Sequence, residues 1–399
     1  MLKLGEKIIS DIYLGDKKIA KVFLGDKLVY QAGKPIFLEY ISFDGNSWID
    51  TGIEYQTCTA EITVKYYEDN KRMLNGWSDQ PGCYWGMYTD GRLELGTIYL
   101  SNTNLREKTT VNISLDSSTN TLTATVNGES ISRSGTGSSR SYWIGATTSA
   151  SSSKVVGEVY GNKFWNTEGE LIQDLRPCIH PNGTVCFYDM VTKKYFYNQG
   201  TGTLKAGGRF VESIVSDGNC YINTGIKASY DYTIKTKYMY TSFVGAYNCI
   251  FGTRSQAVSE GNKIYWVGCN STGTKDLMLR MGKTTLPYSL KLNEVIDLEI
   301  TPNEAIINGT NLGDAMFDGE IGFDSNIYLF NINMGGDGST ALFASVAIMY
   351  IFQIYNNNME LIQDLRPYVD ADGVACFKDL VTNTLFYNQG TGTLTYTEV

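Results

Sequence analysis

The chain contains one segment of 35 residues twice, at 170–204 and 360–394, and this duplication constrains the fold more than any other feature. The two copies align without a gap at an offset of 190 residues and are identical at 23 of the 35 positions. The middle of each copy reads as a hairpin, with a strand, a polar turn at Asp189 or Asp379, and a returning strand that ends in Phe-Tyr-Asn. We therefore expect two domains of the same fold, each closed by this segment.

The repeat extends well beyond this segment. The motif DGNSWIDTGI at 44–53 matches DGNCYINTGI at 217–226, and the offset grows from 173 to 190 along the chain, so the second copy carries loop insertions. Three matches lie between the two ends: Leu74-Asn75-Gly76 with Ile250-Phe251-Gly252, Tyr84-Trp85 with Tyr265-Trp266, and 111–128 with 295–309. The sequence thus predicts domains at 36–207 and 210–399, after an N-terminal segment at 1–34.

The composition and the residue pattern favour strands. Tyr (28) and Gly (41) are frequent while Pro (7) is rare, which is typical of short strands joined by tight turns. Apolar residues alternate at Ala60, Ile62, Val64 and Tyr66, as they do in a strand with one buried face, and no segment has a convincing helical pattern. The apolar run 341–355 is shorter than the roughly 20 residues of a membrane-spanning helix, so we expect a buried strand. The predicted class is all-β, with two tandem antiparallel sandwiches.

The first 30 residues carry a shorter repeat. Leu-Gly-Glu-Lys or Leu-Gly-Asp-Lys occurs at 4–7, 14–17 and 24–27, and Gly followed by an acidic residue suits a two-residue hairpin turn. The pattern predicts a β-meander that is too small to be stable alone. It should dock on another protein or on sister copies, as a trimer or dimer, through residues Ile12, Tyr13, Val22, Phe23, Val29 and Tyr30.

Charge and cysteine usage exclude some classes. A net charge of −9 and a pI near 4.9 oppose binding to nucleic acid, which requires clustered Lys and Arg. The N-terminus has no uninterrupted apolar stretch, so neither an export signal nor membrane insertion is expected. The spacing of the eight Cys residues does not indicate a disulfide framework. Free thiols are favoured, with disulfides or a metal site as alternatives.

Several motifs carry a resemblance to known families. The strand-turn-strand unit ending in Asn127-Gly128, followed by GEVY at 157–160 and FWN at 164–166, resembles the laminin-G-like or concanavalin-like jelly roll. The motif DGNSWIDTGI and the segment from Asp174 to Leu204 are similar to modules in virion proteins of phages of gut bacteria. The N-terminal repeat resembles the leader of tail-fibre, head-fibre or adhesin proteins.

The resemblance implies a phage structural protein of the fibre or decoration type. It would be made in the host cytoplasm and localised in the virion, with the N-terminus on other virion proteins and the jelly-roll loops on a host surface glycan or protein. A passive decoration or spacer protein, a glycosidase and a bacterial surface adhesin remain as alternatives.

Catalytic groups are sparse. His180 is the one histidine, and Asp370 stands at its place in the second copy, so we interpret it as a turn residue rather than a general base. Jelly-roll glycosidases place two carboxylates on one strand face. The nearest pattern here is Glu294, Asp297 and Glu299, in which Glu294 points to the opposite face from the other two. We therefore expect that the protein is not an enzyme.

Aromatic residues beside Gly-rich loops are the candidates for carbohydrate binding, because an aromatic face can stack on a sugar ring. They are Trp77, Tyr84, Trp85 and Trp266, and the alternative is that they pack in the core.

Two polar motifs have both a structural and a ligand-binding interpretation. Asp44, Asp217 and Asp370 could supply oxygen ligands, but turns explain them better, so no cofactor is expected and calcium is left open. The repeated Asp-Leu-Arg-Pro at 174–177 and 364–367 is either a ligand clamp or a structural ion pair of Arg with a carboxylate across the sandwich edge. In the structural interpretation, which we prefer, Pro ends the strand.

Overall fold

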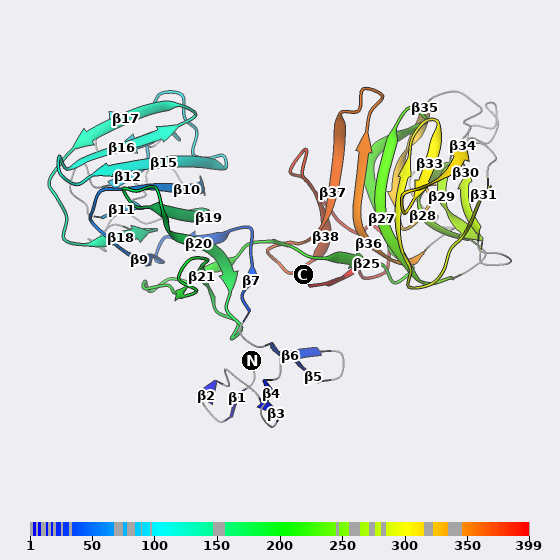
Figure 1. The fold of residues 1–399 in the computed structure, drawn as a ribbon, viewed down its shortest axis with the longest axis horizontal. Helices are drawn as coiled ribbons and strands as arrows, with labels where there is room; N and C mark the ends of the chain where they lie inside the picture. Colours follow the sequence, from blue (N-terminus) through cyan, green and yellow to red (C-terminus); the bar gives the residue numbers. More distant parts are fainter. Residues whose placement is uncertain are drawn as a thin grey trace. The chain divides into compact units, whose positions relative to one another are not determined.

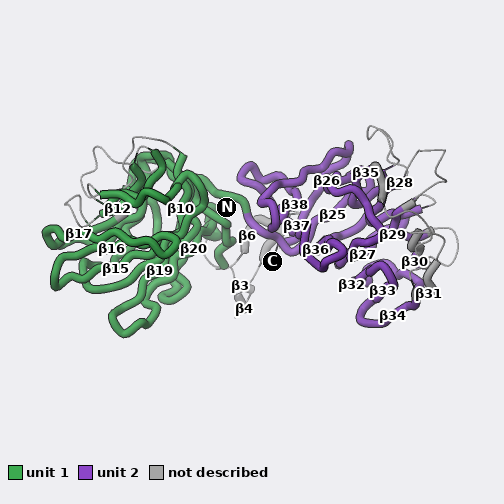
Figure 2. The backbone as a smooth tube through the Cα atoms, turned by 90° about the horizontal axis from the view of Figure 1, so that it is seen from above, with its two compact units in different colours: residues 1–208 green, residues 209–399 purple. Residues whose placement is uncertain are grey.

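The computed structural model describes residues 34–67, 75–77, 84–88, 90–95, 98–146, 156–244, 247–254, 264–270, 276–280, 285–314, 322–333 and 345–398, and the backbone of six short strands before residue 34. The chain divides into two compact units, unit 1 at Met1–Gly208 and unit 2 at Arg209–Val399 (Figure 2). All regular structure in the described residues is strand, which confirms the predicted all-β class. This part of the chain holds no apolar helix of membrane-spanning length.

Unit 1 is a sandwich of two antiparallel sheets (Figure 1). The main path of its larger, eleven-stranded sheet is, in order, β17 (Glu129–Ser134), β16 (Thr121–Val126), β15 (Thr109–Asp116), β10 (Cys58–Tyr66), β19 (Val156–Trp165), β20 (Leu171–Ile179), β21 (Val185–Asp189) and β22 (Tyr195–Phe196). Three short strands pair beside this path: β7 (Ile36–Phe37) on β20, β8 (Ile41–Asp44) on β19, and β23 (Lys205–Ala206) on β8. The six-stranded sheet runs β14 (Ile98–Tyr99), β13 (Leu93–Leu95), β12 (Tyr84–Met87), β11 (Asn75–Gly76), β18 (Ser141–Ile144) and β9 (Ile49–Glu54).

Unit 2 repeats this topology strand for strand. The main path of its eleven-stranded sheet is β34 (Thr310–Asp314), β33 (Glu304–Ile307), β32 (Val295–Ile300), β27 (Thr233–Ser242), β36 (Val346–Tyr355), β37 (Leu361–Val369), β38 (Ala375–Asp379) and β39 (Leu385–Phe386), with β24 (Arg209–Phe210), β25 (Ser213–Val215) and β40 (Thr395–Thr397) beside it. The six-stranded sheet runs β31 (Thr285–Ser289), β30 (Asp276–Arg280), β29 (Ile264–Asn270), β28 (Tyr247–Arg254), β35 (Gly322–Leu329) and β26 (Ile222–Ser229). Each strand from β7 to β23 therefore has a counterpart from β24 to β40.

The core of each unit lies between its two sheets, where the sequence pattern predicts it. The alternating residues of β10 are all buried, and the ring of Tyr142 from the small sheet meets Phe164 of the large sheet edge-on at 5.0 Å. The Asn-Gly turns after β16 and β33 have positive φ at both residues, as a two-residue hairpin requires. Within the predicted apolar run 341–355, β36 covers Val346–Tyr355, and residues 341–344 lie outside the described residues. The residues of β36 alternate between buried and partly buried except at 350–351, where the bulge lies.

The N-terminal repeat forms hairpins in the predicted places. The pairs are β1 (Lys3–Leu4) with β2 (Lys7–Ile8), β3 (Tyr13–Leu14) with β4 (Lys17–Lys18), and β5 (Lys21–Leu24) with β6 (Lys27–Gln31). The described strands make three separate sheets and not the one continuous meander that the repeat predicts. A two-residue turn fixes the register of only its own two strands. Of the six residues predicted to dock, Ile12 lies outside the described residues, and the structure describes only the backbone of the other five.

The opening and closing motifs of each unit bind one another, in a contact that we call the terminal clasp. In unit 1, Asp44 accepts the N–H of Asn46 through Oδ1 and that of Thr203 through Oδ2, at 2.9 and 2.6 Å. The Oδ1 atom of Asn198 accepts the N–H of Trp48 at 3.0 Å. The same bonds recur in unit 2 between Asp217 and Thr393 and between Asn388 and Tyr221. The opening and closing motifs, each of which recurs in both copies, therefore contact each other in both units.

The terminal clasp should weaken in acid. Burial tends to raise the pKa of Asp44, but hydrogen bonds from Thr203, Asn46 and Ser47 outweigh it and hold the pKa below its ordinary value. A lowered pKa in the folded state adds stability above the unfolded pKa, and this stability is lost as the pH falls through the folded pKa. Asp44→Asn should therefore be less stable than the natural chain near neutral pH and approach it below about pH 4. Thermal unfolding across this range measures the difference, and an unchanged difference at all pH values would contradict the role of the charge.

Candidate functional site

The aromatic residues predicted to bind a sugar are buried. Trp77 and Trp85 are fully buried, and Tyr84 and Trp266 expose less than a tenth of their surface. The indole N–H of Trp85 donates to the hydroxyl of Tyr142 at 3.1 Å, and the ring of Trp77 meets Tyr142 edge-on. Rings packed in this way offer no face to a sugar, so the prediction is wrong and the core interpretation holds. Tyr84 and Trp85 are neighbours on β12, whose four residues are all buried, so nearby Gly residues do not indicate that these rings are exposed.

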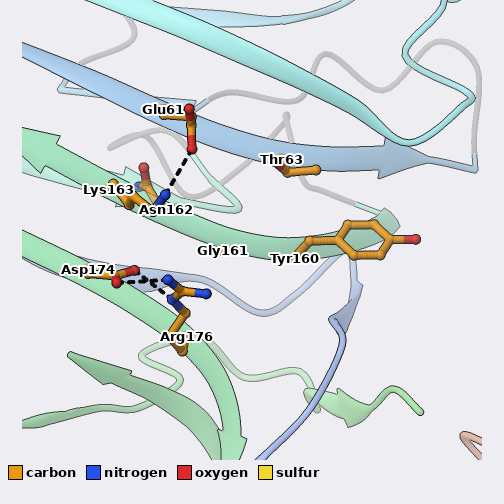
Figure 3. A pocket seen from close by; sticks show the side chains of 8 residues that line it. All are labelled: Glu61, Thr63, Tyr160, Gly161, Asn162, Lys163, Asp174 and Arg176. Carbon is orange, nitrogen blue, oxygen red and sulfur yellow. Dashed lines mark hydrogen bonds and ion pairs between the residues drawn. The ribbon is translucent and has the colours of Figure 1, made fainter. Parts of the chain in front are cut away.

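A polar pocket lies on the outer face of the large sheet of unit 1 (Figure 3). Its volume is about 110 Å³. The central strands β10, β19 and β20 supply all of its lining: Glu61, Thr63, Tyr160, Gly161, Asn162, Lys163, Asp174 and Arg176. Glu61 and Thr63 alternate along β10 with the buried Ala60, Ile62 and Val64, which places their side chains on the side away from the core.

A β-bulge shapes the pocket. Thr63 pairs with Gly161 and Val64 pairs with Val159, so Tyr160 is the extra residue of β19. The same bulge occurs in unit 2, where Lys237 pairs with Ile351. Gly161 leaves space beside Thr63, whereas unit 2 has an isoleucine side chain at that register. The pocket of unit 1 is therefore built on a framework common to both units, which differ in the side chain at this position.

Two ion pairs line the pocket. The Nζ atom of Lys163 lies 3.3 Å from Oε1 of Glu61. The guanidinium of Arg176 donates from Nε and Nη2 to the two oxygens of Asp174, at 2.7 and 3.0 Å. Figure 3 shows a further guanidinium nitrogen of Arg176 directed away from Asp174. The pocket thus combines two cationic donors and two carboxylate acceptors, with no net charge.

The Asp-Leu-Arg-Pro motif differs from its predicted geometry. Asp174 and Arg176 pair along one strand and on one face, not across the sandwich edge, and Arg366 pairs with Asp364 in the same way. Pro177 does not end the strand either, because β20 continues to Ile179. At Pro177 the strand changes its neighbour from β19 to β7, so the missing N–H falls in a gap of the ladder.

Tyr160 forms a fixed wall of the pocket. Its hydroxyl donates to the carboxylate of Glu158, which is buried and also accepts the hydroxyl of Tyr67. Burial and the bond to Glu158 raise the pKa of Tyr160, so the phenol stays protonated. The ammonium of Lys108 lies 4.1 Å from the centre of the ring. These contacts hold the ring of Tyr160 in one orientation.

Aromatic rings continue the surface from Arg176, which pairs with Tyr188 across β20 and β21. The ring centres of Phe37 and Tyr188, of Tyr188 and Tyr195, and of Tyr195 and Tyr197 are 6.1, 4.9 and 6.3 Å apart. We call these four residues the aromatic row. Phe37 and Tyr197 expose 43% and 37% of their surface. In unit 2 the equivalent positions hold Phe210, Lys378, Leu385 and Tyr387.

The remaining predicted residues serve turns and ion pairs. His180 accepts the N–H of Asn182 at Nδ1, and Asp370 accepts that of Asp372, each within a hairpin turn. Glu299 lies 3.0 Å from the ammonium of Lys235, its partner across the ladder. Among the residues that the structure describes, no group of three or more acidic, His or Cys side chains could hold a metal ion.

Of the residues in the pocket and the aromatic row, the sequence pointed only to Asp174 and Arg176, through the ligand-clamp interpretation of the Asp-Leu-Arg-Pro motif. A comparison of the two copies with each other could have pointed to this surface. Outward residues differ at Lys163 and Gln353, at Tyr188 and Lys378, and at Tyr195 and Leu385, although the framework around them is the same. These differences lie on one face of otherwise equivalent sheets.

The fold and the site define a tandem β-sandwich protein with a polar surface pocket in its first unit. No protein-family model matches the chain, and no curated protein does. Among solved structures, domains LG4-5 of the mouse laminin alpha1 chain are similar, with 11% identity over 84% of this chain and 91% of that chain and a TM-score of 0.29. At so low a TM-score, the fold class rests on the strand order of the two units.

Proposed function

We propose that the chain is a non-enzymatic attachment protein whose unit 1 binds a neutral sugar of a surface glycan. The observation that carries this proposal is the polar pocket with the aromatic row directly beside it on one sheet face. Protein sites for small ligands combine apolar and aromatic surface with a few placed polar groups. Unit 2 shares the framework but not this combination.

The aromatic row would bind the apolar faces of sugar rings. Tyr and Phe present broad flat surfaces, and stacking on them is favourable because it removes apolar area from water on both partners. Phe37 and Tyr197 are exposed, and Tyr188 and Tyr195 between them are partly exposed, so the surface extends over several rings. This length suits an oligosaccharide better than a single sugar.

The pocket would bind the hydroxyl groups of one sugar. Glu61 and Asp174 can accept O–H groups and Arg176 can donate N–H groups, and hydrogen bonds to charged groups are stronger than neutral ones. Because each charge in the pocket is already paired, a charged ligand would leave one partner uncompensated. The ligand that fits this balance is an uncharged polyol.

The size of the pocket points to weak contacts on the surface. Its volume of about 110 Å³ is well below the roughly 300–1,000 Å³ of pockets that enclose a ligand. A sugar would therefore stay largely in solvent, and useful affinity would come from many copies on one particle. This fits the resemblance of the sequence motifs to virion modules, and we propose a phage fibre or decoration protein that attaches the virion to its host.

We propose binding without catalysis because both carboxylates of the pocket are engaged in ion pairs. A glycosidase needs one carboxyl group that donates a proton to the leaving oxygen. Glu61 and Asp174 are each engaged in an ion pair, with Lys163 and Arg176, so neither carboxyl group is placed to serve a leaving oxygen.

Arg176→Ala and Tyr188→Lys should each weaken glycan binding about tenfold or more, since each removes a contact at the centre of the site. The full chain is first tested on a glycan array, and its strongest ligand is then titrated against the variants. Arg366→Ala, which removes the same ion pair from unit 2, is the matched control and should leave the affinity unchanged.

Other outcomes would contradict the proposal. An equal loss for Arg366→Ala would place binding elsewhere. An array without any binding, together with firm association with particles, would indicate a passive spacer. Release of reducing sugar from a polysaccharide would indicate a glycosidase.

A further inference from the structure

Two thiols of unit 1 face each other across neighbouring strands. Cys178 of β20 and Cys186 of β21 are register partners, and their sulfur atoms lie 3.6 Å apart. Directly opposite residues of an antiparallel pair have Cα atoms about 4.5–5.5 Å apart, which lies within the span of about 4.4–6.8 Å that a disulfide bridges. The backbone therefore already holds these residues at bonding distance.

This arrangement is specific to one unit. Cys376 is the counterpart of Cys186 in unit 2, and it faces Tyr368 where unit 1 has Cys178. Both copies of the repeat thus have a thiol on the second strand of this pair, Cys186 on β21 and Cys376 on β38. In unit 1 the residue opposite this thiol is a cysteine, and in unit 2 it is a tyrosine. Cys178, Cys186 and Cys376 are free thiols in the structure.

The two thiols are unequal. The contact with the Cys178 sulfur lowers the pKa of Cys186, an effect that burial opposes and a backbone hydrogen bond at His180 supports, and the same contact raises the pKa of Cys178. The thiolate is the nucleophile in disulfide exchange, so Cys186 is the group that reacts first. Cys178 is then the neighbour that completes the bond.

A thin cover separates the pair from solvent. Both thiols are fully buried, and burial together with their nearness raises the pKa of Tyr195 to about 12. Tyr195 belongs to β22, which pairs with β21 through only two residues. Strands held by so few hydrogen bonds open locally at low cost, and such an opening would expose Cys186.

We propose that Cys178 and Cys186 are a redox site that forms a reversible disulfide by exchange with a small-molecule disulfide. The thiolate of Cys186 attacks one sulfur of the reagent, forms a mixed disulfide and releases the first thiolate. Cys178 then attacks the sulfur of Cys186 and releases the second. One S–S bond breaks and one forms, and the two thiol protons pass to the two leaving thiolates. The product covalently ties β20 to β21, next to Arg176 and Tyr188.

The test uses the full chain treated with oxidised glutathione under native conditions, followed by alkylation and tryptic digestion. No Lys or Arg lies between the two cysteines, so one peptide carries both. We expect this peptide to be unalkylated and lighter by the two thiol hydrogens, and Cys376 to remain a free thiol. Dithiothreitol should reverse the change. The oxidised chain should also unfold several degrees higher, a shift that is absent in Cys178→Ser.

Two results would overturn the proposal. One is a peptide whose cysteines both remain free under conditions that oxidise the thiols of the denatured chain. The other is stable glutathione on Cys186 with Cys178 still free, because it would show that the second step does not occur.

Discussion

Asp189→Ala is expected to destabilise unit 1 by about 3–4 kcal/mol, since it leaves buried N–H donors without an acceptor. Asp189 is fully buried. Its Oδ1 atom accepts the N–H groups of Asp174 and Val191 at 2.8 and 3.0 Å, and Oδ2 accepts the N–H and the hydroxyl of Thr192. One carboxylate therefore joins the β21 to β22 turn to the strand that carries the pocket.

Denaturant unfolding of the full chain measures this loss, and hydrogen exchange assigns it to unit 1. Asp379→Ala should cause a similar loss in unit 2, where Asp379 accepts the equivalent N–H groups of Asp364 and Val381. Asp116→Ala is the matched control, because Asp116 also accepts four hydrogen bonds, at an exposed turn where water can replace them. Equal losses for Asp189→Ala and Asp116→Ala would contradict the role of burial.

Gly200→Ala should destabilise unit 1 by about 2–3 kcal/mol, because the terminal clasp has no room for a methyl group. A Cβ atom at Gly200 would lie 2.1 Å from the carbonyl oxygen of Asn46 and 3.0 Å from the Cα atom of Ser47. Both contacts are with backbone, so the opening and closing motifs would have to separate. Gly390 meets Asn219 in the same way in unit 2.

Thermal unfolding, with hydrogen exchange to identify the unit, measures the effect. A loss of this size lowers the unfolding temperature of a domain of this length by roughly 4–12 °C. Thr201→Ala changes the exposed residue next to Gly200 and should have almost no effect. The clasp would be unimportant if Gly200→Ala behaved like Thr201→Ala.

The duplication made the architecture predictable. Two copies that match at both ends, and in which apolar and polar residues alternate, are compatible with few folds. The residues of β10 that this alternation predicts to be buried are buried. In the small sheet, however, the alignment of the two copies was shifted by one residue. It aligned Tyr84 with Tyr265, whereas the ladder pairs Gly76 with Tyr84 and Gly252 with Trp266. A slip of one residue exchanges the two faces of a strand, and sequence similarity in a short aromatic run does not fix the register.

The site was less predictable because it depends on contacts between strands distant in sequence. Nothing near Glu61 indicates that Lys163 lies opposite it, since 102 residues separate them. Trp77 and Trp85 were candidates for binding because Gly-rich loops lie beside them, but Trp77, just after β11, and Trp85, on β12, are both buried in the core. The pocket also depends on the missing side chain at Gly161. This feature becomes apparent only when Gly161 is compared with Ile351 at the equivalent position of unit 2.

Hydrogen exchange of the full chain, with and without its strongest glycan ligand, decides whether unit 1 carries the binding site. The ligand should slow exchange in 156–179, which contains β19 and β20, and leave the equivalent residues 346–369 of unit 2 unchanged. Protection in unit 2 instead, or in neither segment while the ligand is bound, would show that the pocket and the aromatic row are not the site.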